Sequence, residues 1–225
     1  MLRVSLIIPA LNEAASLGRL LDEVPSGLLY QLIVVDNGST DGTAEVARAS
    51  GAQVIAEPRH GYGFACAAGA ASANGDILVF MDGDGSFMPA ELTNLLAPLV
   101  SEQADLVLGS RMSRAGQQIV MPPHQLFGNR LFVWLLQRRF GLSITDLGPY
   151  RAIRGDLLHS LNMQEQTFGW PLEMIMKTAR RQCSIVEIPI TYRPRFAGQS
   201  KVGGTLRGSF LTAYRYFSVW ARYVC

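Results

Sequence analysis

Two carboxylates, Asp82 and Asp84, stand one residue apart at the end of an apolar run that extends from Ile77 to Met81. A glycine follows each of them, which predicts a buried strand that ends in a turn. Ligands bind at the carboxyl ends of strands in open α/β sheets, and Mg²⁺ or Mn²⁺ prefers carboxylate oxygens together with substrate phosphates. The pair therefore indicates a metal–diphosphate site, although Asp-x-Asp by itself fits an ordinary solvated turn equally well.

Three earlier apolar runs also end in polar turn residues. They cover residues 4–9, 31–36 and 53–56, and the segments between them have helical apolar spacing or are rich in alanine. This alternation predicts an α/β fold with a mostly parallel central sheet flanked by helices. The strand ends then share one edge of the sheet and bring together the residues that follow them, namely Asn12, Glu13, Asp36, Asn37, His60, Gly61, Asp82 and Asp84.

The second half of the chain has fewer clear elements. Pro189 places a predicted strand at an edge of the sheet, and Gly116, Pro122 and Pro123 predict a loop over residues 111–124. The further elements that we expect are strands at residues 105–109 and 185–192 and helices at residues 126–140 and 170–181.

The residues after the first strand exclude two common nucleotide sites. A Rossmann site has Gly-x-Gly-x-x-Gly there, and a Walker site has Gly-x-x-x-x-Gly-Lys. Residues 9–13 instead read Pro-Ala-Leu-Asn-Glu, so we reject an NAD site. A nucleotide-sugar pyrophosphorylase also combines an α/β sheet with metal carboxylates, but it would carry a glycine-rich loop with Lys or Arg at this position.

Three stretches resemble the signature segments of family 2 glycosyltransferases, in their order and in their spacing. They are SLIIPALNE at residues 5–13, VVDNGSTDGT at residues 34–43 and MDGD at residues 81–84. The resemblance extends from residue 4 to about residue 205. It implies a GT-A fold, a nucleotide-sugar donor, and Mg²⁺ or Mn²⁺ as cofactor.

Three later stretches resemble one branch of that family, the dolichyl-phosphate mannose synthases and other polyprenyl-phosphate glycosyltransferases. They are LGSR at residues 108–111, TDLGPYR at residues 145–151 and RPRFAGQSK at residues 193–201. This branch implies inverting transfer of a hexose from a UDP- or GDP-linked donor to a polyprenyl or dolichyl phosphate. The resemblance leaves the base and the sugar open.

The resemblance also implies roles for donor-binding residues. Pro9, Ala10 and Glu13 match the stretch that meets the nucleoside. Asp36 and Asn37 match a pair that contacts base and ribose, although the family usually has a second Asp where this chain has Asn37. Gly61, which follows the third strand, is a further donor-binding candidate.

The charged residues of the implied site lie far apart in the sequence. Asp82 and Asp84 match the metal–diphosphate pair, and Arg111 matches an arginine near the donor diphosphate. A flexible phosphate-binding loop is matched by Arg195, Ser200 and Lys201. We therefore expect the catalytic set to be Asp84, Arg111, Asp146 and Lys201.

Asp146 enters this set because the acceptor is open. A hydroxyl acceptor needs a general base, and Asp146 is the candidate, although a structural turn residue fits it as well. A phosphate acceptor is already an anionic nucleophile and needs cations to position it. A non-catalytic nucleotide- or membrane-binding module remains the alternative outside enzymes.

Charge divides the chain into two halves. Residues 1–105 hold thirteen Asp and Glu against four Arg and Lys, whereas residues 106–225 hold five against sixteen. Arginine suits phosphates and lipid head groups, so the second half favours anionic partners. We expect a nucleotide-sugar and a lipid or glycan acceptor, and no nucleic acid.

The tail is rich in aromatic residues and arginine. We expect residues 1–204 to form the GT-A domain and residues 205–225 to form an amphipathic helix. Such a helix fits peripheral contact with a membrane and equally fits packing on the sheet or in a homodimer.

The chain shows neither a signal peptide nor an apolar run of about 18 residues, which a membrane span requires. Its three cysteines have no disulfide or metal-ligand spacing. We therefore expect a cytoplasmic protein that works in the cytosol or at the cytoplasmic face of a membrane.

Overall fold

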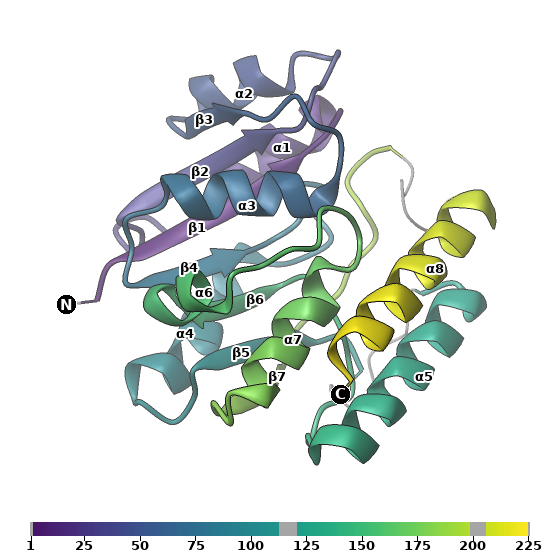
Figure 1. The fold of residues 1–225 in the computed structure, drawn as a ribbon. Helices are drawn as coiled ribbons and strands as arrows, with labels where there is room; N and C mark the ends of the chain where they lie inside the picture. The colour runs from purple at the N-terminus through teal and green to yellow at the C-terminus, as the bar shows by residue number, and fades with distance from the viewer. Residues whose placement is uncertain (1, 113–120, 199–205, 225) are drawn as a thin grey trace.

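The computed structural model describes residues 2–112, 121–198 and 206–224 of the chain (Figure 1). Within them lies a seven-stranded sheet with strand order β3-β2-β1-β4-β6-β5-β7. Its strands are β1 (Val4–Ala10), β2 (Gln31–Asp36), β3 (Gln53–Ala56), β4 (Ile77–Phe80), β5 (Leu106–Ser110), β6 (Arg151–Arg154) and β7 (Ile185–Pro189).

Six of these strands were expected, and one was not. The first four strands pair in parallel and β7 pairs in parallel with β5, so the predicted α/β fold with a mostly parallel sheet is confirmed. Strand β6 is antiparallel to both of its neighbours. Its sequence, Arg-Ala-Ile-Arg, is too short and too polar to stand out as a buried strand, although Arg151 is almost fully buried.

Helices cover both faces of the sheet (Figure 1). Side chains of a strand alternate between faces, so Ile7 packs in one core cluster with α3 and α7 while Leu6 and Ile8 pack in the other with α1 and α4. The helices are α1 (Ala14–Asp22), α2 (Thr43–Ala49), α3 (Tyr62–Ser72), α4 (Leu92–Val100), α5 (Pro123–Phe140), α6 (Gly155–Leu161), α7 (Trp170–Arg180) and α8 (Leu206–Tyr223), with a 3₁₀ turn at Pro89–Glu91.

The strand ends gather as expected. In the parallel register Ala10 pairs with Asp36, and Ile7 pairs with Phe80, the last residue of β4. Asp36 and the turn that carries Asp82 and Asp84 therefore lie at the same edge of the sheet. Strand β7 lies at the far edge, as Pro189 predicted, and it ends at that proline.

Helices α5 and α8 lie side by side beyond the β7 edge (Figure 1). Phe132 of α5 contacts the rings of Tyr216 and Phe217 at centroid distances of 5.1 and 5.0 Å, and Val219 is fully buried. The inner face of the tail helix is thus a packing face within the chain. Among the described residues, no helix is long and apolar enough to cross a membrane.

Helix α5 begins at Pro123, three residues before the expected start at Leu126. Proline is favoured in the first turn of a helix because its missing N–H would have no partner there. The expected loop over residues 111–124 is thereby shortened at its end, and its residues 113–120 lie outside the described chain.

Candidate active site

The turn after β4 presents Asp84 in a fixed orientation. Its Oδ1 accepts hydrogen bonds from the Ser86 backbone N–H at 2.8 Å and from the Ser86 hydroxyl at 2.6 Å. Its Oδ2 lies 3.0 Å from Nη1 of Arg195. Ser86 is almost fully buried, so it braces Asp84.

Asp82 lies among the other charged residues of the expected site. Burial, the negative charge of Asp84 and, to a smaller extent, that of Glu13 together raise the pKa of Asp82 to about 7, although the positive charges of Arg111 and Arg195 act in the opposite direction. These neighbours show that the fold brings the residues predicted for the metal–diphosphate site together.

A divalent cation fits the cluster formed by the Asp82, Asp84 and Glu13 carboxylates, because it would relieve their mutual repulsion. The described residues contain no group of three or more His, Cys, Asp or Glu side chains arranged to hold a metal. Two carboxylates completed by substrate phosphates are, however, an ordinary shell for Mg²⁺. Asp82 and Asp84 are therefore the residues that would hold the cation.

Arg195 connects this turn to the first strand. Its Nη2 lies 2.9 Å from Oε1 of Glu13, the buried residue that precedes α1, while its Nη1 faces Asp84. Two of the predicted phosphate-loop residues, Ser200 and Lys201, lie outside the described residues.

The side chain of Asn37, which the resemblance places against base and ribose, makes hydrogen bonds with the loop that follows β3. Its amide nitrogen donates to the carbonyls of Glu57 and Arg59 at 2.9 and 2.7 Å, and its Oδ1 accepts from the backbone N–H of Gly61 at 2.9 Å. The amide thus shapes the loop between β3 and α3. An aspartate could not donate to those two carbonyls, which accounts physically for an amide at this position.

Asp36 stays at the end of β2, where its Oδ1 accepts from the Ser39 N–H at 2.9 Å. Pro9 and Ala10 form the neighbouring end of β1. These three residues and Gly61 belong to the half of the strand-end edge formed by β1, β2 and β3, where the nucleoside was expected, whereas the turn with Asp82 and Asp84 follows β4 on the other side of β1.

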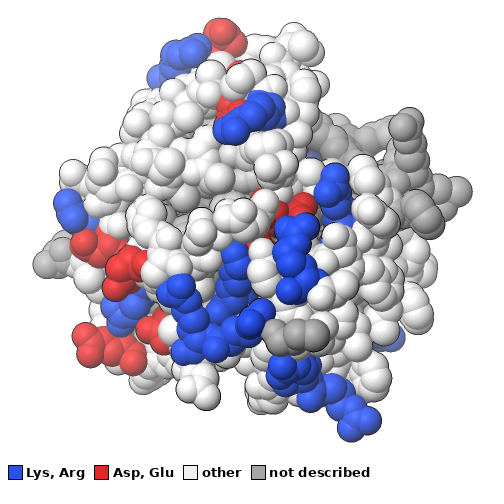
Figure 2. All heavy atoms as spheres, viewed as in Figure 1, with Lys and Arg blue, Asp and Glu red and all other residues white. Residues whose placement is uncertain are grey.

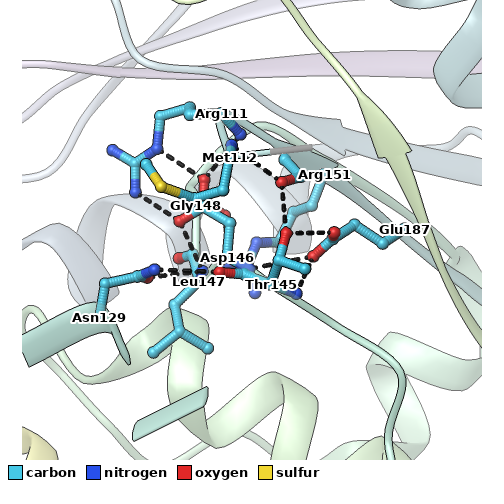
Figure 3. A network of polar contacts seen from close by, with 10 residues as sticks. Arg111, Met112, Asn129, Thr145, Asp146, Leu147, Gly148, Arg151 and Glu187 are labelled. Carbon is cyan, nitrogen blue, oxygen red and sulfur yellow. Dashed lines mark hydrogen bonds and ion pairs between the residues drawn. The ribbon is translucent and has the colours of Figure 1, made fainter. Parts of the chain in front are cut away.

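Arg111 and Asp146 form a buried, two-pronged ion pair (Figure 3). Nε and Nη2 of Arg111 donate to the two carboxylate oxygens at 2.7 and 2.8 Å, and the Arg111 and Leu147 backbone N–H groups donate at 2.9 and 2.8 Å. Burial alone would raise the pKa of Asp146, but the charge and hydrogen bonds of Arg111 lower it overall.

This geometry favours a positioning role for Asp146 over the role of general base. Both oxygens already accept hydrogen bonds, and the lowered pKa makes the carboxylate a weak proton acceptor. Asp146 holds the guanidinium of Arg111 in place near Asp82.

Two residues that the sequence reasoning missed hold this pair in position (Figure 3). Glu187 of β7 accepts from the backbone N–H and hydroxyl of Thr145, both at 2.6 Å, and from the Asp146 N–H at 3.0 Å. Asn129 of α5 accepts from the Leu147 N–H at 3.0 Å and donates to the Thr145 carbonyl at 3.1 Å. The only sequence signal for Asn129 is a polar residue on the buried side of a helix.

Next to the ion pair, α5 borders a cavity of about 290 Å³. Its wall joins apolar and polar side chains, and two of the lining residues, Met112 and Thr145, adjoin Arg111 and Asp146 in the chain. The lining residues are Met112, Arg130, Val133, Trp134, Gln137 and Thr145.

A model of the family described as glycosyl transferase family 2 matches residues 5–160 of the chain. This protein belongs to glycosyl transferase family 2. It is a glycosyltransferase, and its sheet and helices have the GT-A fold that the resemblance implied.

This glycosyltransferase matches three curated relatives over most of its own length and most of theirs. An uncharacterized glycosyltransferase of Mycobacterium tuberculosis is 39% identical, with 96% of this chain and 97% of the relative covered. The undecaprenyl-phosphate mannosyltransferase of Micrococcus luteus is 34% identical, with 99% and 96% covered. The dolichyl-phosphate hexose transferase of Haloferax volcanii is 32% identical, with 88% and 86% covered.

Among solved structures, this glycosyltransferase resembles glucosyl-3-phosphoglycerate synthase of Mycobacterium tuberculosis. The complex of that enzyme with Mn²⁺, UDP-glucose and phosphoglyceric acid has a TM-score of 0.81 and 26% identity, covering 99% of this chain and 80% of the other. Another structure of it contains Mg²⁺ and UDP, with a TM-score of 0.76.

Proposed function

We propose that this glycosyltransferase transfers a hexose, with inversion, from a UDP- or GDP-linked donor to a polyprenyl phosphate. Pro9, Ala10, Asp36 and Gly61 would contact the nucleoside, and Glu13 would close the same side. Asp82 and Asp84 would hold Mg²⁺ or Mn²⁺, which when bound neutralises charge on the leaving diphosphate. Arg111, Arg195 and Lys201 would add positive charge beside it, and Ser200 would offer its hydroxyl to a phosphate oxygen.

The observation that carries the acceptor assignment is the outer surface of α5 and α8. Large aromatic side chains are exposed on both helices: Phe127 is 71% exposed, Tyr214 61%, and Trp134 52%. Neither helix contains an Asp or Glu, and α5 alone carries Arg130, Arg138 and Arg139.

Figure 2 shows Lys and Arg side chains gathered over the part of one face where α7 and the carboxyl end of α5 lie. Aromatic rings beside arginines on paired helices suit the interface of an anionic lipid surface. We call the exposed side of α5 and α8, with Phe127, Trp134, Tyr214 and Phe217, the aromatic face. The proposal is that this face meets the membrane from one side, with residues 205–225 as a separate amphipathic unit on the domain formed by residues 1–204.

The cavity beside α5 supports a lipid acceptor. Trp134 belongs both to its wall and to the aromatic face, and Met112 and Thr145 of the same wall adjoin Arg111 and Asp146 in the chain, so a lipid phosphate bound there would lie between that face and the ion pair. Met112, Val133 and Trp134 offer apolar surface to an isoprenoid chain, and Arg130 offers positive charge to a phosphate.

A phosphate acceptor also agrees with the chemistry of the pair. The nucleophile would be an anionic phosphate oxygen that attacks the anomeric carbon while the bond to the donor diphosphate breaks. Such an oxygen needs no strong base, and Asp146 is already engaged by Arg111. The surrounding arginines would hold the two anions close to each other.

One observation favours a second candidate function. The structural similarity to glucosyl-3-phosphoglycerate synthase suggests a small phosphorylated acceptor used with UDP-glucose. The aromatic face favours the lipid, because a small soluble acceptor requires no exposed aromatic rings.

The deciding experiment measures transfer from labelled UDP-glucose and GDP-mannose by the full chain with Mn²⁺ or Mg²⁺. The acceptors are a short polyprenyl phosphate, the corresponding free alcohol and phosphoglyceric acid. We expect transfer to the polyprenyl phosphate and little to the other two. Equal transfer to the alcohol would overturn the phosphate-nucleophile mechanism and restore Asp146 as a base, and preference for phosphoglyceric acid would establish the second candidate.

A further inference from the structure

A short segment after β7, residues 192–196, lies directly on the turn that carries Asp84. We call it the strap. Arg193 donates its backbone N–H to the Ser86 carbonyl at 3.0 Å and its Nε–H to the Gly85 carbonyl at 2.6 Å. Phe196 donates its N–H to the Asp84 carbonyl at 3.0 Å. The strap is therefore anchored to the turn at both of its ends.

Phe196 is held more tightly than its place in a loop suggests. Its ring contacts two guanidinium groups, with Arg19 of α1 at 4.0 Å and Arg193 at 4.3 Å from the ring centre. Its edge rests on Gly85, where an added Cβ would come within 2.3 Å of the ring. Arg193 is itself tied to Glu23 of α1 at 2.5 Å.

The residue between these anchors is Arg195. Its two terminal nitrogens face Asp84 and Glu13 at 3.0 and 2.9 Å. Ser86 already donates two hydrogen bonds to the other oxygen of Asp84, so a cation that approaches the Asp84 carboxylate meets the positive charge of Arg195 and must compete with it. The buried Nε of Arg195 has no hydrogen-bond partner among the described residues, so this position does not satisfy the guanidinium completely.

We propose that Arg195 is a built-in counterion that occupies the cation position of the nucleotide-free enzyme, and that Phe196 is the positioning residue that holds it there. This rests on the metal–diphosphate site of the proposed function. Asp82, Asp84 and Glu13 would repel one another in this partly buried place, and Arg195, paired with Asp84 and Glu13, offsets their charge until the metal arrives.

Binding of the nucleotide donor then favours replacement of Arg195 by the cation. When a divalent cation takes Asp82 and Asp84, Arg195 loses Asp84 and keeps only Glu13, and a diphosphate offers new oxygens that match its planar fork. The metal alone must compete with Arg195 for the carboxylate. When a nucleotide diphosphate binds with the metal, the diphosphate pairs with the displaced Arg195, so the competition is removed. Metal and nucleotide therefore bind with positive coupling, and by linkage each raises the affinity for the other equally.

The test measures binding of Mn²⁺ alone to the full chain, from the free-ion signal in electron paramagnetic resonance. Arg195→Gln should bind Mn²⁺ about tenfold more tightly than the native chain, which corresponds to about 1.4 kcal/mol of lost competition. The same variant should lose most of the coupling between Mn²⁺ and UDP or GDP and should turn over more slowly. A residue that only supported the fold would not tighten metal binding.

Phe196 is tested by a graded pair of variants. Phe196→Leu removes the ring but keeps much of the bulk, and it should tighten Mn²⁺ binding in the same direction as Arg195→Gln, by a smaller factor. Phe196→Tyr should restore the native affinity. Arg19→Ala should resemble Phe196→Leu, whereas Arg48→Ala, another exposed arginine near an acidic residue on its own helix, should change nothing.

Unchanged or weaker Mn²⁺ binding by Arg195→Gln, in a variant whose thermal unfolding is native-like, would overturn the proposal. Native affinity in Phe196→Leu would remove the positioning role of Phe196. These measurements need no acceptor and no turnover, so an error in the acceptor assignment leaves them intact. Retention of Mn²⁺ binding by Asp84→Ala would instead mean that the metal site of the proposed function is wrong.

Discussion

Asp146 receives both prongs of the Arg111 guanidinium at 2.7 and 2.8 Å, and none of its side chain is exposed to solvent. Removing one partner of a buried ion pair leaves an uncompensated charge in a place that excludes water. A substitution that breaks the Arg111–Asp146 pair should therefore lower the stability of the fold and also disturb the proposed site.

Asp146→Asn should lower the free energy of unfolding by about 3–5 kcal/mol, because Arg111 would keep its charge without a buried counterion. Urea unfolding at neutral pH measures this loss. Asp22→Asn, at an exposed position of α1, is the control and should change the stability little. If Asp146→Asn lost no more free energy of unfolding than Asp22→Asn, Arg111 would have found another partner.

The same pair predicts a pH dependence. Because the pKa of Asp146 is lower in the folded chain than in the unfolded chain, the unfolded state binds more protons in acid. The stabilising contribution is complete above the unfolded pKa, near 3.8, and disappears as the pH falls through the folded value. The free energy of unfolding, measured from neutral pH to strong acid, should therefore fall less steeply with decreasing pH in Asp146→Asn than in the native chain.

Asp84→Ala should abolish binding of the nucleotide donor that depends on a divalent cation while leaving the fold intact. The carboxylate belongs to a turn, so its loss removes the hydrogen bonds from Ser86 and the contact with Arg195, which keeps Glu13, and it removes no core side chain. Thermal shift with Mn²⁺ and a panel of nucleotide-sugars measures the effect, since ligand binding stabilises by mass action. Cation-dependent turnover at the native rate would contradict the assignment.

Asn37→Asp should destabilise the loop between β3 and α3 and should not improve contact with the nucleoside. The carboxylate would face the Glu57 and Arg59 carbonyls, which lose their donor, at a cost of about 1–3 kcal/mol. We expect a lower unfolding temperature and a higher KM for the donor. Asn74→Asp, at an exposed position, is the matched control, and a native KM in Asn37→Asp would show that the loop does not shape the donor site.

The aromatic face predicts binding to anionic vesicles that weakens as salt rises. Trp134→Ala and Tyr214→Ala should each reduce binding, and Arg130→Gln should cost about 1 kcal/mol. These substitutions are sharper than deletion of residues 206–225, because α8 also covers Phe132. Tyr30→Ala, an exposed aromatic elsewhere, is the control.

Vesicle flotation at low and high salt measures these effects, and the oligomeric state must be determined for the same variants. Native vesicle binding by Trp134→Ala and Tyr214→Ala, together with conversion of a dimer to a monomer, would show that the aromatic face joins two copies of the chain.

The first four strands were predictable because each is an apolar run bounded by turn residues, a pattern set by residues close together in the chain. The bounds of β2 and β3 agree with those expected from the sequence alone. Parallel pairing then required that the polar ends of these strands share an edge, so the positions of Asp36, Asp82 and Asp84 followed from local patterns and a general rule of topology.

The tertiary structure decided which partners these residues have. Glu13 and Arg195 are 182 residues apart, and Thr145 and Glu187 are 42 apart, so no local pattern reports their contact. The resemblance placed Asn37 in the donor site, but only the fold shows that its amide is occupied by the next loop. Composition and spacing specify which chemical groups are present, whereas the hydrogen bonds that orient them depend on chain segments that only folding brings together.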